Sequence, residues 1–266
     1  MKKPEAFEIT ESVRKRYGEI ARQEKSGCGC ASSGCCSVPS SEPLGTSSLQ
    51  LGYTAEDIES VPAGADLGLG CGNPHAIAAL RQGETVLDLG SGAGFDCFLA
   101  ARQVGDAGRV IGVDMTPDMV DKARKHARTG GYSNVEFRLG EIEHIPAADA
   151  SVDVVISNCV INLSSDKGRV FREAFRVLRP GGRLAISDVV ATAPLPEEVR
   201  GDLALYSSCV AGALPIDELE TLLRDSGFHE VRIEPKDESR QFIREWAPGR
   251  KVEDYIVSAV IEAVKP

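Results

Sequence analysis

The chain contains eight cysteines, whose chemistry needs an explanation in a protein of 266 residues: Cys28, Cys30, Cys35, Cys36, Cys71, Cys97, Cys159 and Cys209. In a short secreted protein such a set would indicate disulfides, whereas in a cytosolic enzyme it more often serves metal binding or catalysis. Thiolates are soft ligands that select soft ions. The cysteines therefore point to binding or catalysis by thiols.

Two of these cysteines fall where a predicted sheet would present a ligand. Cys159 directly follows the predicted strand at 152–158, and the carboxyl edge of a parallel sheet is where ligands bind. Cys209 lies beyond the fifth predicted strand, in a segment that can fold back over the same edge. We therefore expect both thiols beside a ligand-binding cleft at this edge, and Cys71 lies before the first predicted strand.

The remaining cysteines allow simpler interpretations. Cys97 lies on a predicted helix, where a free cysteine commonly packs as a small hydrophobic side chain. Residues 26–48 are rich in Gly, Ser, Cys and Pro and show no periodicity, which predicts a loop. Its four thiols could bind zinc, but their spacing is not the C-x₂-C pairing typical of structural zinc.

A glycine-rich turn forms the second chemical motif. Gly90, Gly92 and Gly94 follow a predicted strand and precede a helix, so the backbone can approach a ligand closely. Their alternate spacing differs from the G-x-G-x-x-G of dinucleotide sites and resembles the first motif of Rossmann-like methyltransferases. Asp114 ends the next predicted strand, where a carboxylate can accept hydrogen bonds from both ribose hydroxyls. The pair predicts a site for S-adenosylmethionine, with another doubly wound fold as the alternative.

Strands and helices alternate around these motifs. The predicted strands cover residues 84–90, 109–114, 135–139, 152–158 and 183–188, with helices at 95–104, 117–129 and 166–178. This alternation implies a parallel sheet covered on both faces, with right-handed crossovers. Outside it we expect an amphipathic helix at 5–25, helical segments at 55–60, 196–206 and 216–226, and an antiparallel pair at 230–233 and 255–263.

The expected organisation has three regions. Residues 1–70 form an N-terminal helix and a cysteine-rich loop region, residues 71–195 form a Rossmann-like domain that binds S-adenosylmethionine, and residues 196–266 form an α+β portion that completes the sheet and the acceptor site. The predicted fold class is therefore α/β, with a doubly wound sheet.

Composition excludes several partners. The formal charge is −10 and the pI about 5.0, and no basic patch is evident, which argues against nucleic acid and anionic membranes. The N-terminus has no apolar signal region and no stretch approaches eighteen apolar residues, so a cytoplasmic protein is expected. Four scattered histidines are expected at the surface or at helix ends: His75, His126, His144 and His229.

Short runs around the cysteines carry a more specific resemblance. Asn-Cys-Val-Ile-Asn-Leu at 158–163, Gly-Cys-Gly-Asn-Pro at 70–74, Gly-Phe-Asp-Cys at 94–97 and the segment around Cys209 are similar to those of the arsenite methyltransferase family, which methylates trivalent arsenic. The likeness spans essentially residues 7–233. It implies a class I, Rossmann-like methyltransferase that acts in arsenic detoxification.

The resemblance also implies individual roles. Cys71, Cys159 and Cys209 correspond to family thiols that bind As(III), and a further N-terminal thiol is expected, for which Cys36 or Cys35 is favoured over Cys28 and Cys30. The residues implied in binding S-adenosylmethionine are Tyr53, Asp88, Gly90, Ser91, Gly92, Gly94, Asp114, Met115, Glu141, Ile142 and Asn158. Glutathione or thioredoxin would serve as the thiol reductant.

The implied chemistry suits these residue types. Trivalent arsenic binds three thiolates in a pyramid and keeps a lone pair, which can attack a sulfonium methyl group without a general base. Two other functions stay open: a methyltransferase for a carbon, oxygen or nitrogen acceptor, and a thiol-rich protein that binds metalloids without turnover.

Overall fold

One sheet organises the part of the chain that the computed structural model describes, residues 4–23 and 48–266. Its strands are β1 (Thr85–Leu89), β2 (Arg109–Asp114), β3 (Val135–Leu139), β4 (Val152–Asn158), β5 (Leu178–Ala191), β6 (His229–Lys236) and β7 (Ile256–Val264). Within the described ranges they form a seven-stranded sheet in the order β3-β2-β1-β4-β5-β7-β6. Strands β1 to β5 pair in parallel, and β7 runs antiparallel to β5 and β6. The predicted α/β sheet and its closing antiparallel pair are confirmed.

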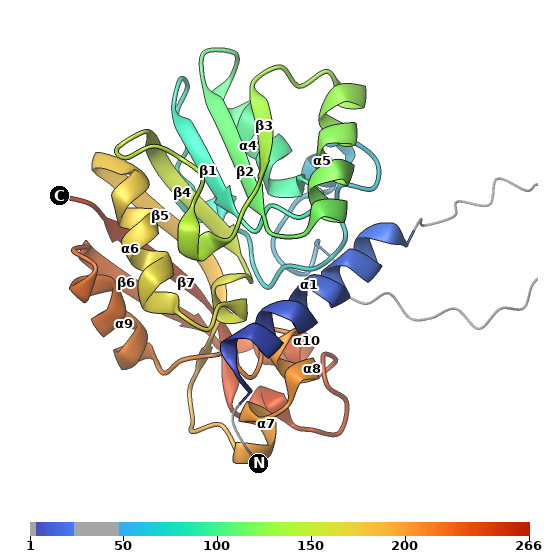
Figure 1. Cartoon of the computed structure of the whole chain (residues 1–266), viewed down its shortest axis with the longest axis vertical. Coiled ribbons are helices and arrows are strands. Elements are labelled where there is room, and N and C mark those ends of the chain that lie inside the picture. The colour runs from blue at the N-terminus through green and yellow to red at the C-terminus, as the bar shows by residue number, and fades with distance from the viewer. Residues whose placement is uncertain (1–3, 24–47) are drawn as a thin grey trace, which may run out of the picture.

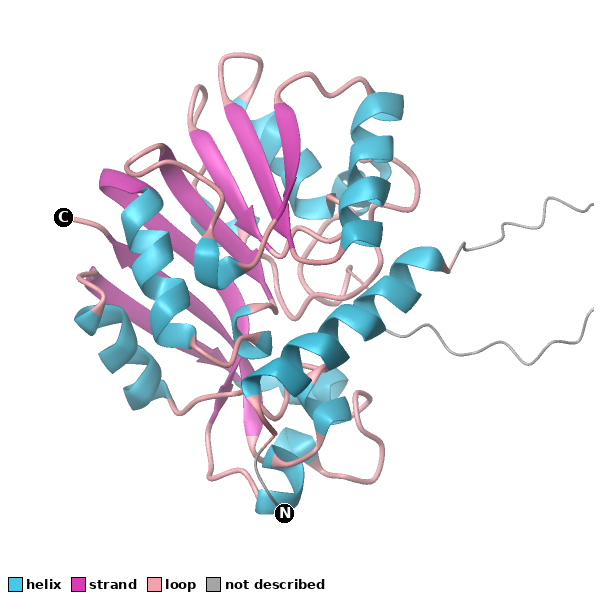
Figure 2. Ribbon diagram, in the orientation of Figure 1, coloured by secondary structure: helices cyan, strands magenta, loops and turns pink. Residues whose placement is uncertain are grey.

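Helices cover both faces of this sheet (Figures 1 and 2). The longer ones are α1 (Ala6–Arg22), α4 (Phe95–Val104), α5 (Pro117–Gly130), α6 (Lys167–Val177) and α9 (Ile216–Asp225). Shorter helices occur in the connections: α2 (Ala55–Glu59), α3 (His75–Ala78), α7 (Glu197–Arg200), α8 (Leu203–Tyr206) and α10 (Arg240–Ile243), with 3₁₀ turns η1 (Ile142–His144), η2 (Ile161–Leu163), η3 (Asp237–Ser239) and η4 (Val252–Asp254).

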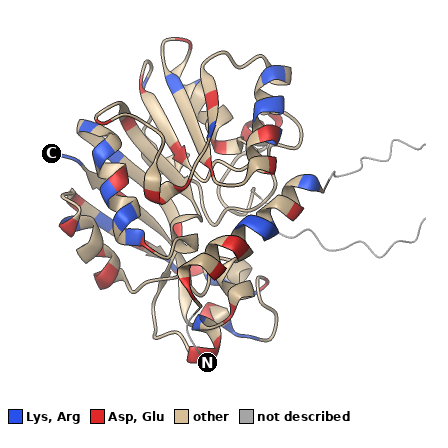
Figure 3. Ribbon diagram, viewed as in Figure 1, with Lys and Arg blue, Asp and Glu red and all other residues tan. Residues whose placement is uncertain are grey.

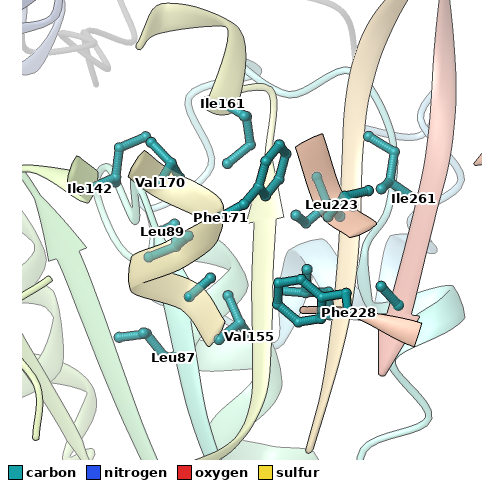
Figure 4. Close-up of a cluster of buried hydrophobic side chains, with 14 of the residues drawn as sticks. Leu87, Leu89, Ile142, Val155, Ile161, Val170, Phe171, Leu223, Phe228 and Ile261 are labelled. Carbon is teal, nitrogen blue, oxygen red and sulfur yellow. The ribbon is translucent and has the colours of Figure 1, made fainter. Parts of the chain in front are cut away.

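The alternation of side chains along β1 divides the core between the two faces. Leu87 and Leu89 pack with Phe171 of α6 and Leu223 of α9 in one buried cluster (Figure 4). Val86 points to the opposite face and packs with α4 and α5. The order of strands reverses between β1 and β4, and doubly wound sheets bind ligands in the crevice at such a switch point.

Two predicted elements differ from the structure for local reasons. The helical segment expected at 196–206 is divided in two, because α7 ends at Arg200 and α8 begins at Leu203. Asp202 caps α8 by accepting hydrogen bonds from the backbone N–H groups of Ala204 and Leu205. The strand expected at 183–188 extends back to Leu178, with a register shift opposite Val152/Val154 that absorbs the Arg-Pro-Gly-Gly run.

Helix α1 lies outside the two layers and crosses the end of the sheet (Figure 1). Its apolar face buries Ile9 and Val13 against the C-terminal part of the chain. Ion pairs also join it to the other side of the crevice, from Arg14 to Glu141 at 2.9 Å and from Arg22 to Asp118 at 2.5 Å. The helix therefore bridges the crevice between its two walls.

Charged residues of both signs are mixed along the helices rather than segregated. Helix α1 carries both acidic and basic residues, and the basic residues of α6 are interspersed with an acidic one (Figure 3). None of the helices in the described ranges has both the length and the apolar character needed to cross a membrane.

Candidate active site

A cavity of about 350 Å³ opens at the carboxyl ends of β1, β2 and β4. This volume is in the range of small-molecule sites. Most residues expected to bind the methyl donor contribute to its wall: Tyr53, Asp88, Gly90, Ser91, Gly92, Asp114, Met115, Glu141, Ile142 and Asn158. Gly94 does not line the cavity, because its α-carbon faces Phe98 and Phe137, each less than 3 Å from where a β-carbon would lie. Gly94 is therefore a packing glycine at the start of α4.

The glycine-rich turn forms the floor of this cavity. Gly90 has a φ of +72°, and a β-carbon there would lie 2.4 Å from Val160, so the side chain of Val160 fills the space that glycine leaves. Gly92 has a φ of +51°, and within the described part of the chain no atom lies within 4 Å of where its β-carbon would lie. The backbone at Gly92 is thus open to a ligand.

Asp114 is held against this turn by backbone donors. Its Oδ2 accepts the N–H of Gly92 at 2.9 Å, and its Oδ1 accepts the N–H of Thr116 at 2.8 Å. Burial raises the pKa of the Asp114 carboxyl, while these two hydrogen bonds lower it. Each oxygen can accept a second hydrogen bond, so the carboxylate can receive two ligand hydroxyls.

The polar groups of the cavity fit S-adenosylmethionine. The Ser91 hydroxyl is buried and has no hydrogen-bond partner among the described residues, although it lines the cavity. Buried polar atoms are normally paired, so a ligand group is expected to complete it. Asp88, Asp96 and Asp114 all line the wall. This ligand carries hydroxyl, ammonium and sulfonium groups, and three acidic side chains favour such a cation.

Asn158 connects this cavity, called the donor cavity below, to the loop that carries Cys71. Its Oδ1 accepts the backbone N–H of Cys71 at 3.0 Å. Its Nδ2 donates to the carbonyl of Gly72 at 2.9 Å and to the hydroxyl of Tyr53 at 3.0 Å. That hydroxyl in turn donates to Asp96 at 2.6 Å. The amide therefore fixes the Cys71 loop relative to two residues of the cavity wall.

Three thiols gather behind this wall. Cys71, Cys159 and Cys209 belong to one buried cluster with α1 and α8 residues, and are 1%, 4% and 2% exposed. Cys159 itself lines the cavity. The three thiols lie close enough to influence one another's pKa, and all are free. The structure thus brings together the three cysteines that the resemblance implies, next to the donor cavity.

Cys159 and Cys209 share an uncommon backbone conformation. Their φ angles are +59° and +63°, in the left-handed region that non-glycine residues rarely occupy. The Cys209 thiol donates to the carbonyl of Cys159 at 2.7 Å, so the two turns are linked. Such conformations persist where the surrounding structure enforces them, and they concentrate at functional sites.

The apolar surroundings keep these thiols protonated. Burial raises the pKa of Cys71 from 9.0 to about 11. For Cys209, the hydrogen bond with Cys159 raises the pKa first, and burial adds to it. For Cys159, the hydrogen bond with Cys209 lowers the pKa, but the interaction with Cys71 and burial outweigh it. The site therefore holds neutral thiols rather than a buried cluster of negative charges.

Some features of the site were not predicted. Asp96 and Asp188 are buried acidic residues that the sequence does not distinguish from other carboxylates, and Tyr17 of α1 lines the cavity. The expectation that histidines lie at the surface or at helix ends is wrong for His126. That ring is buried within α5, and its Nδ1 contacts the carbonyl of Ala93 in the glycine-rich turn at 3.1 Å. The N-terminal candidates lie outside the described residues: Cys28, Cys30, Cys35 and Cys36.

The segment that presents Cys209 leaves no room for a side chain at Gly212. A β-carbon there would lie 2.0 Å from the carbonyl oxygen of Asn162 in η2. We expect Gly212→Ala to lower the free energy of unfolding by about 1–3 kcal/mol, because the backbone of the segment must shift. Gly168→Ala in α6 is the matched control, since the nearest atom to its β-carbon would be the end of the flexible Arg172 side chain at 3.2 Å, with no backbone atom among its nearest neighbours. Denaturant unfolding of both variants tests this, and equal stability would contradict it.

Comparison with known proteins places this site in a family. A family profile described as a methyltransferase domain matches residues 80–227. The chain is 56% identical over 265 residues to an arsenite methyltransferase of Halobacterium salinarum, covering 97% of this chain and 67% of that protein. It is 48% identical over 171 residues to an arsenite methyltransferase of Aquipseudomonas alcaligenes, covering 62% of this chain and 49% of that protein. The chain thus spans about half to two thirds of the length of these relatives.

A solved structure agrees with this assignment. The crystal structure of an arsenic(III) S-adenosylmethionine methyltransferase from Chlamydomonas reinhardtii superimposes with a TM-score of 0.64 at 37% identity. The match covers 80% of this chain and 75% of that one. The sheet and its helices are therefore those of a Rossmann-like, class I methyltransferase. Because 97% of this chain aligns with the Halobacterium protein at 56% identity, the chain belongs to the arsenite methyltransferase family, whose members are enzymes of the methyltransferase class.

Proposed function

We propose that this chain transfers the methyl group of S-adenosylmethionine to trivalent arsenic held by the thiolates of Cys71, Cys159 and Cys209. The observation that carries the proposal is the gathering of these three thiols in one buried cluster, from which Cys159 reaches the wall of the donor cavity. Soft thiolates suit soft ions. Both arsenite and methylarsenite are expected as substrates, and arsenic detoxification is the expected biological role.

The protein's part in this reaction is to supply thiols and to align them. Arsenous acid exchanges its three hydroxides for three thiols, which releases three water molecules and leaves a lone pair on arsenic. When bound, S-adenosylmethionine supplies an electrophilic methyl group on a sulfonium centre. Because no proton leaves arsenic during the transfer, the site needs no general base. The site contributes by orienting arsenic and the methyl group toward each other, and such orientation can supply much of the reduction in the activation free energy.

The residues of the chain divide this work. Asn158 holds the Cys71 loop against the cavity wall, and the left-handed turns at Cys159 and Cys209 direct the other two thiols. Helix α1 covers the cavity through Val13 and Tyr17, which excludes water from the acceptor side. A dry site also protects arsenic–sulfur bonds from exchange with hydroxide.

Electrons must re-enter the cycle, because methylation formally oxidises arsenic. We assign this role to a thiol of the N-terminal cluster, with Cys36 or Cys35 favoured, and to an external reductant such as glutathione or thioredoxin. Both are cytoplasmic thiol systems, which agrees with the expected localisation. The membrane and nucleic acids have no place in this reaction.

Arsenic speciation tests the proposal. The purified chain would be incubated with arsenite, S-adenosylmethionine and glutathione, and the arsenic species would be separated by chromatography. Methylated arsenic formed in step with S-adenosylhomocysteine is the expected result. Consumption of the donor only with an organic acceptor would favour an ordinary small-molecule methyltransferase, and stoichiometric arsenite binding without methylated product would favour a sequestering protein.

The raised thiol pKa values predict how arsenite capture depends on pH. The thiolate is the attacking form, and the pKa of Cys71 lies at about 11. At pH values below that pKa, the thiolate fraction grows as pH rises. We therefore expect the rate of arsenite binding to rise by up to about tenfold per unit between pH 6.5 and 8.5. Stopped-flow measurement of the tyrosine and tryptophan fluorescence checks this, and a rate independent of pH would contradict it.

A further inference from the structure

Asp188 places an oxygen ligand beside two of the thiols. One ligand atom from each of Cys71, Cys159 and Asp188 lies within 4.8 Å of the others, and all three residues are buried. Asp188 belongs to β5 and directly follows Ser187, whose carbonyl accepts the N–H of Cys159 at 2.8 Å and faces the thiol of Cys71 at 3.6 Å. The carboxylate is thus held to the thiol cluster by the same strand that positions both cysteines.

The two oxygens of this carboxylate are held unequally. Oδ1 accepts the side-chain amide of Asn162 at 2.9 Å and the N–H of Val189 at 2.8 Å. Oδ2 accepts a long hydrogen bond from the N–H of Asn162 at 3.3 Å. Burial raises the pKa of this carboxyl, and the backbone N–H of Ile161 and the nearby charge of Lys167 both lower it. Oδ2 is therefore held less tightly than Oδ1.

Trivalent arsenic does not need the Asp188 carboxylate as a ligand. Three sulfurs complete its pyramid, and the lone pair occupies the remaining direction. A divalent d¹⁰ ion has no such lone pair, and zinc sites are almost always tetrahedral, with sulfur at about 2.3 Å and carboxylate oxygen at about 2.0–2.2 Å. Sulfur and oxygen atoms around such an ion lie about 3–4 Å apart, which the observed cluster can reach with a small contraction.

We propose that Cys71, Cys159 and Asp188 form a site for a thiophilic divalent cation of the zinc class, Zn²⁺ or Cd²⁺. Cys209 lies outside this group of three, and its thiol, which contacts the carbonyl of Cys159 at 2.7 Å, moves in as the fourth donor. Binding displaces the protons of the thiols to solvent and involves no change of oxidation state. Because the ion takes the same sulfurs, it excludes trivalent arsenic, and the divalent metal acts as a competitive inhibitor. The exclusion of arsenic rests on the proposed function, whereas metal binding itself does not.

Metal binding is measured on the full chain in a background in which the N-terminal cysteines are removed, so that they do not contribute: Cys28→Ser, Cys30→Ser, Cys35→Ser and Cys36→Ser. Calorimetric titration with ZnCl₂ is expected to give one site. Cys159→Ser and Asp188→Asn are each expected to weaken it by at least about tenfold, as even outer ligands contribute that much. Cys97→Ser is the matched control, since that buried thiol contacts Asp88 instead.

X-ray absorption at the zinc edge of this same background keeps the test independent of how the variants fold. A shell containing sulfur and oxygen supports the site, and loss of the oxygen in Asp188→Asn assigns it to this residue. A shell of sulfur alone, or an unchanged affinity in Asp188→Asn, overturns the proposal. Arsenite titration separates the two ideas. If zinc binds as expected but arsenite does not displace it, the metal site stands and the arsenic function fails; if arsenite binds and zinc does not, the reverse holds.

Discussion

Replacing Cys159 by serine is expected to lower the rate of arsenite methylation by about 100-fold or more, since misplacing a reacting group by about 1 Å can cost that much. Serine supplies a hard oxygen that arsenic binds poorly in competition with water. Of the three clustered thiols, Cys159 is the one that lines the donor cavity, so under the proposed function its loss removes the arsenic ligand nearest to that cavity. Rates of methylarsenic formation measure the effect.

The same experiment separates the acceptor site from the donor site. Equilibrium binding of S-adenosylmethionine to Cys159→Ser should stay within about threefold of the unmodified chain, because the polar contacts of the cavity come from other residues. Cys97→Ser is the matched control: it is as buried as Cys159 but hydrogen-bonds to Asp88 at 3.2 Å, a contact that a hydroxyl can keep. Arsenite methylation that survives at an unchanged rate in Cys159→Ser would overturn the assignment of Cys159 as an arsenic ligand.

The sequence predicts the donor half of the molecule well, because its signals are local. The run from Val86 to Val104 carries its strand, turn and helix in consecutive residues, and Asp114 ends the next strand a short distance along the chain. Buried parallel strands are rich in apolar residues, as the run Val154-Val155-Ile156 in β4 shows, and such runs need no tertiary information to recognise. Accordingly β3, β4 and α4 have the predicted bounds.

The acceptor half depends on contacts between distant segments. Nothing near Asp188 in the sequence distinguishes it from an exposed carboxylate, since its role comes from Cys71 and Cys159 on other elements. Tyr17 likewise reaches the cavity only because α1 folds across the crevice. A scattered histidine such as His126 is expected at the surface or at a helix end, yet packing of α5 on the glycine-rich turn buries it. Burial of isolated polar residues is a tertiary property.

The two left-handed cysteines illustrate the same limit. A cysteine after a strand is a reasonable candidate ligand, but its positive φ cannot be read from residue type, since non-glycine residues there are uncommon. At Cys209 the turn is stabilised from outside, by the close approach of Gly212 to Asn162 and by the hydrogen bond to Cys159. The sequence therefore identifies Cys159 and Cys209 as candidate ligands, but their backbone conformation depends on tertiary contacts.

Asn158 hydrogen-bonds both to Tyr53 of the donor cavity and to the backbone of Cys71. Changing it therefore tests whether the two sites depend on each other. Asn158→Asp keeps the size of the side chain and the oxygen that accepts from Cys71, but replaces the Nδ2 donor by a second oxygen. That oxygen would face the carbonyl of Gly72 and, at about 3.3 Å, a carboxylate oxygen of Asp96. Each buried group left unpaired costs about 1–3 kcal/mol, so we expect a loss of about 100-fold in kcat/KM at pH 8.

The pH profile of Asn158→Asp distinguishes this link from a general loss of stability. Repulsion from Asp96 raises the pKa of the new carboxyl, and its protonated form can donate a hydrogen bond again. Activity relative to the unmodified chain should therefore recover as pH falls and be lost as pH rises through that raised pKa. Asn134→Asp is the matched control, since that amide donates to Ala101 and Gly105 far from the cavity. It should reduce stability but leave the profile unchanged. If Asn158→Asp weakens binding of S-adenosylmethionine alone and leaves arsenite affinity intact, Asn158 serves the donor cavity only and does not position Cys71.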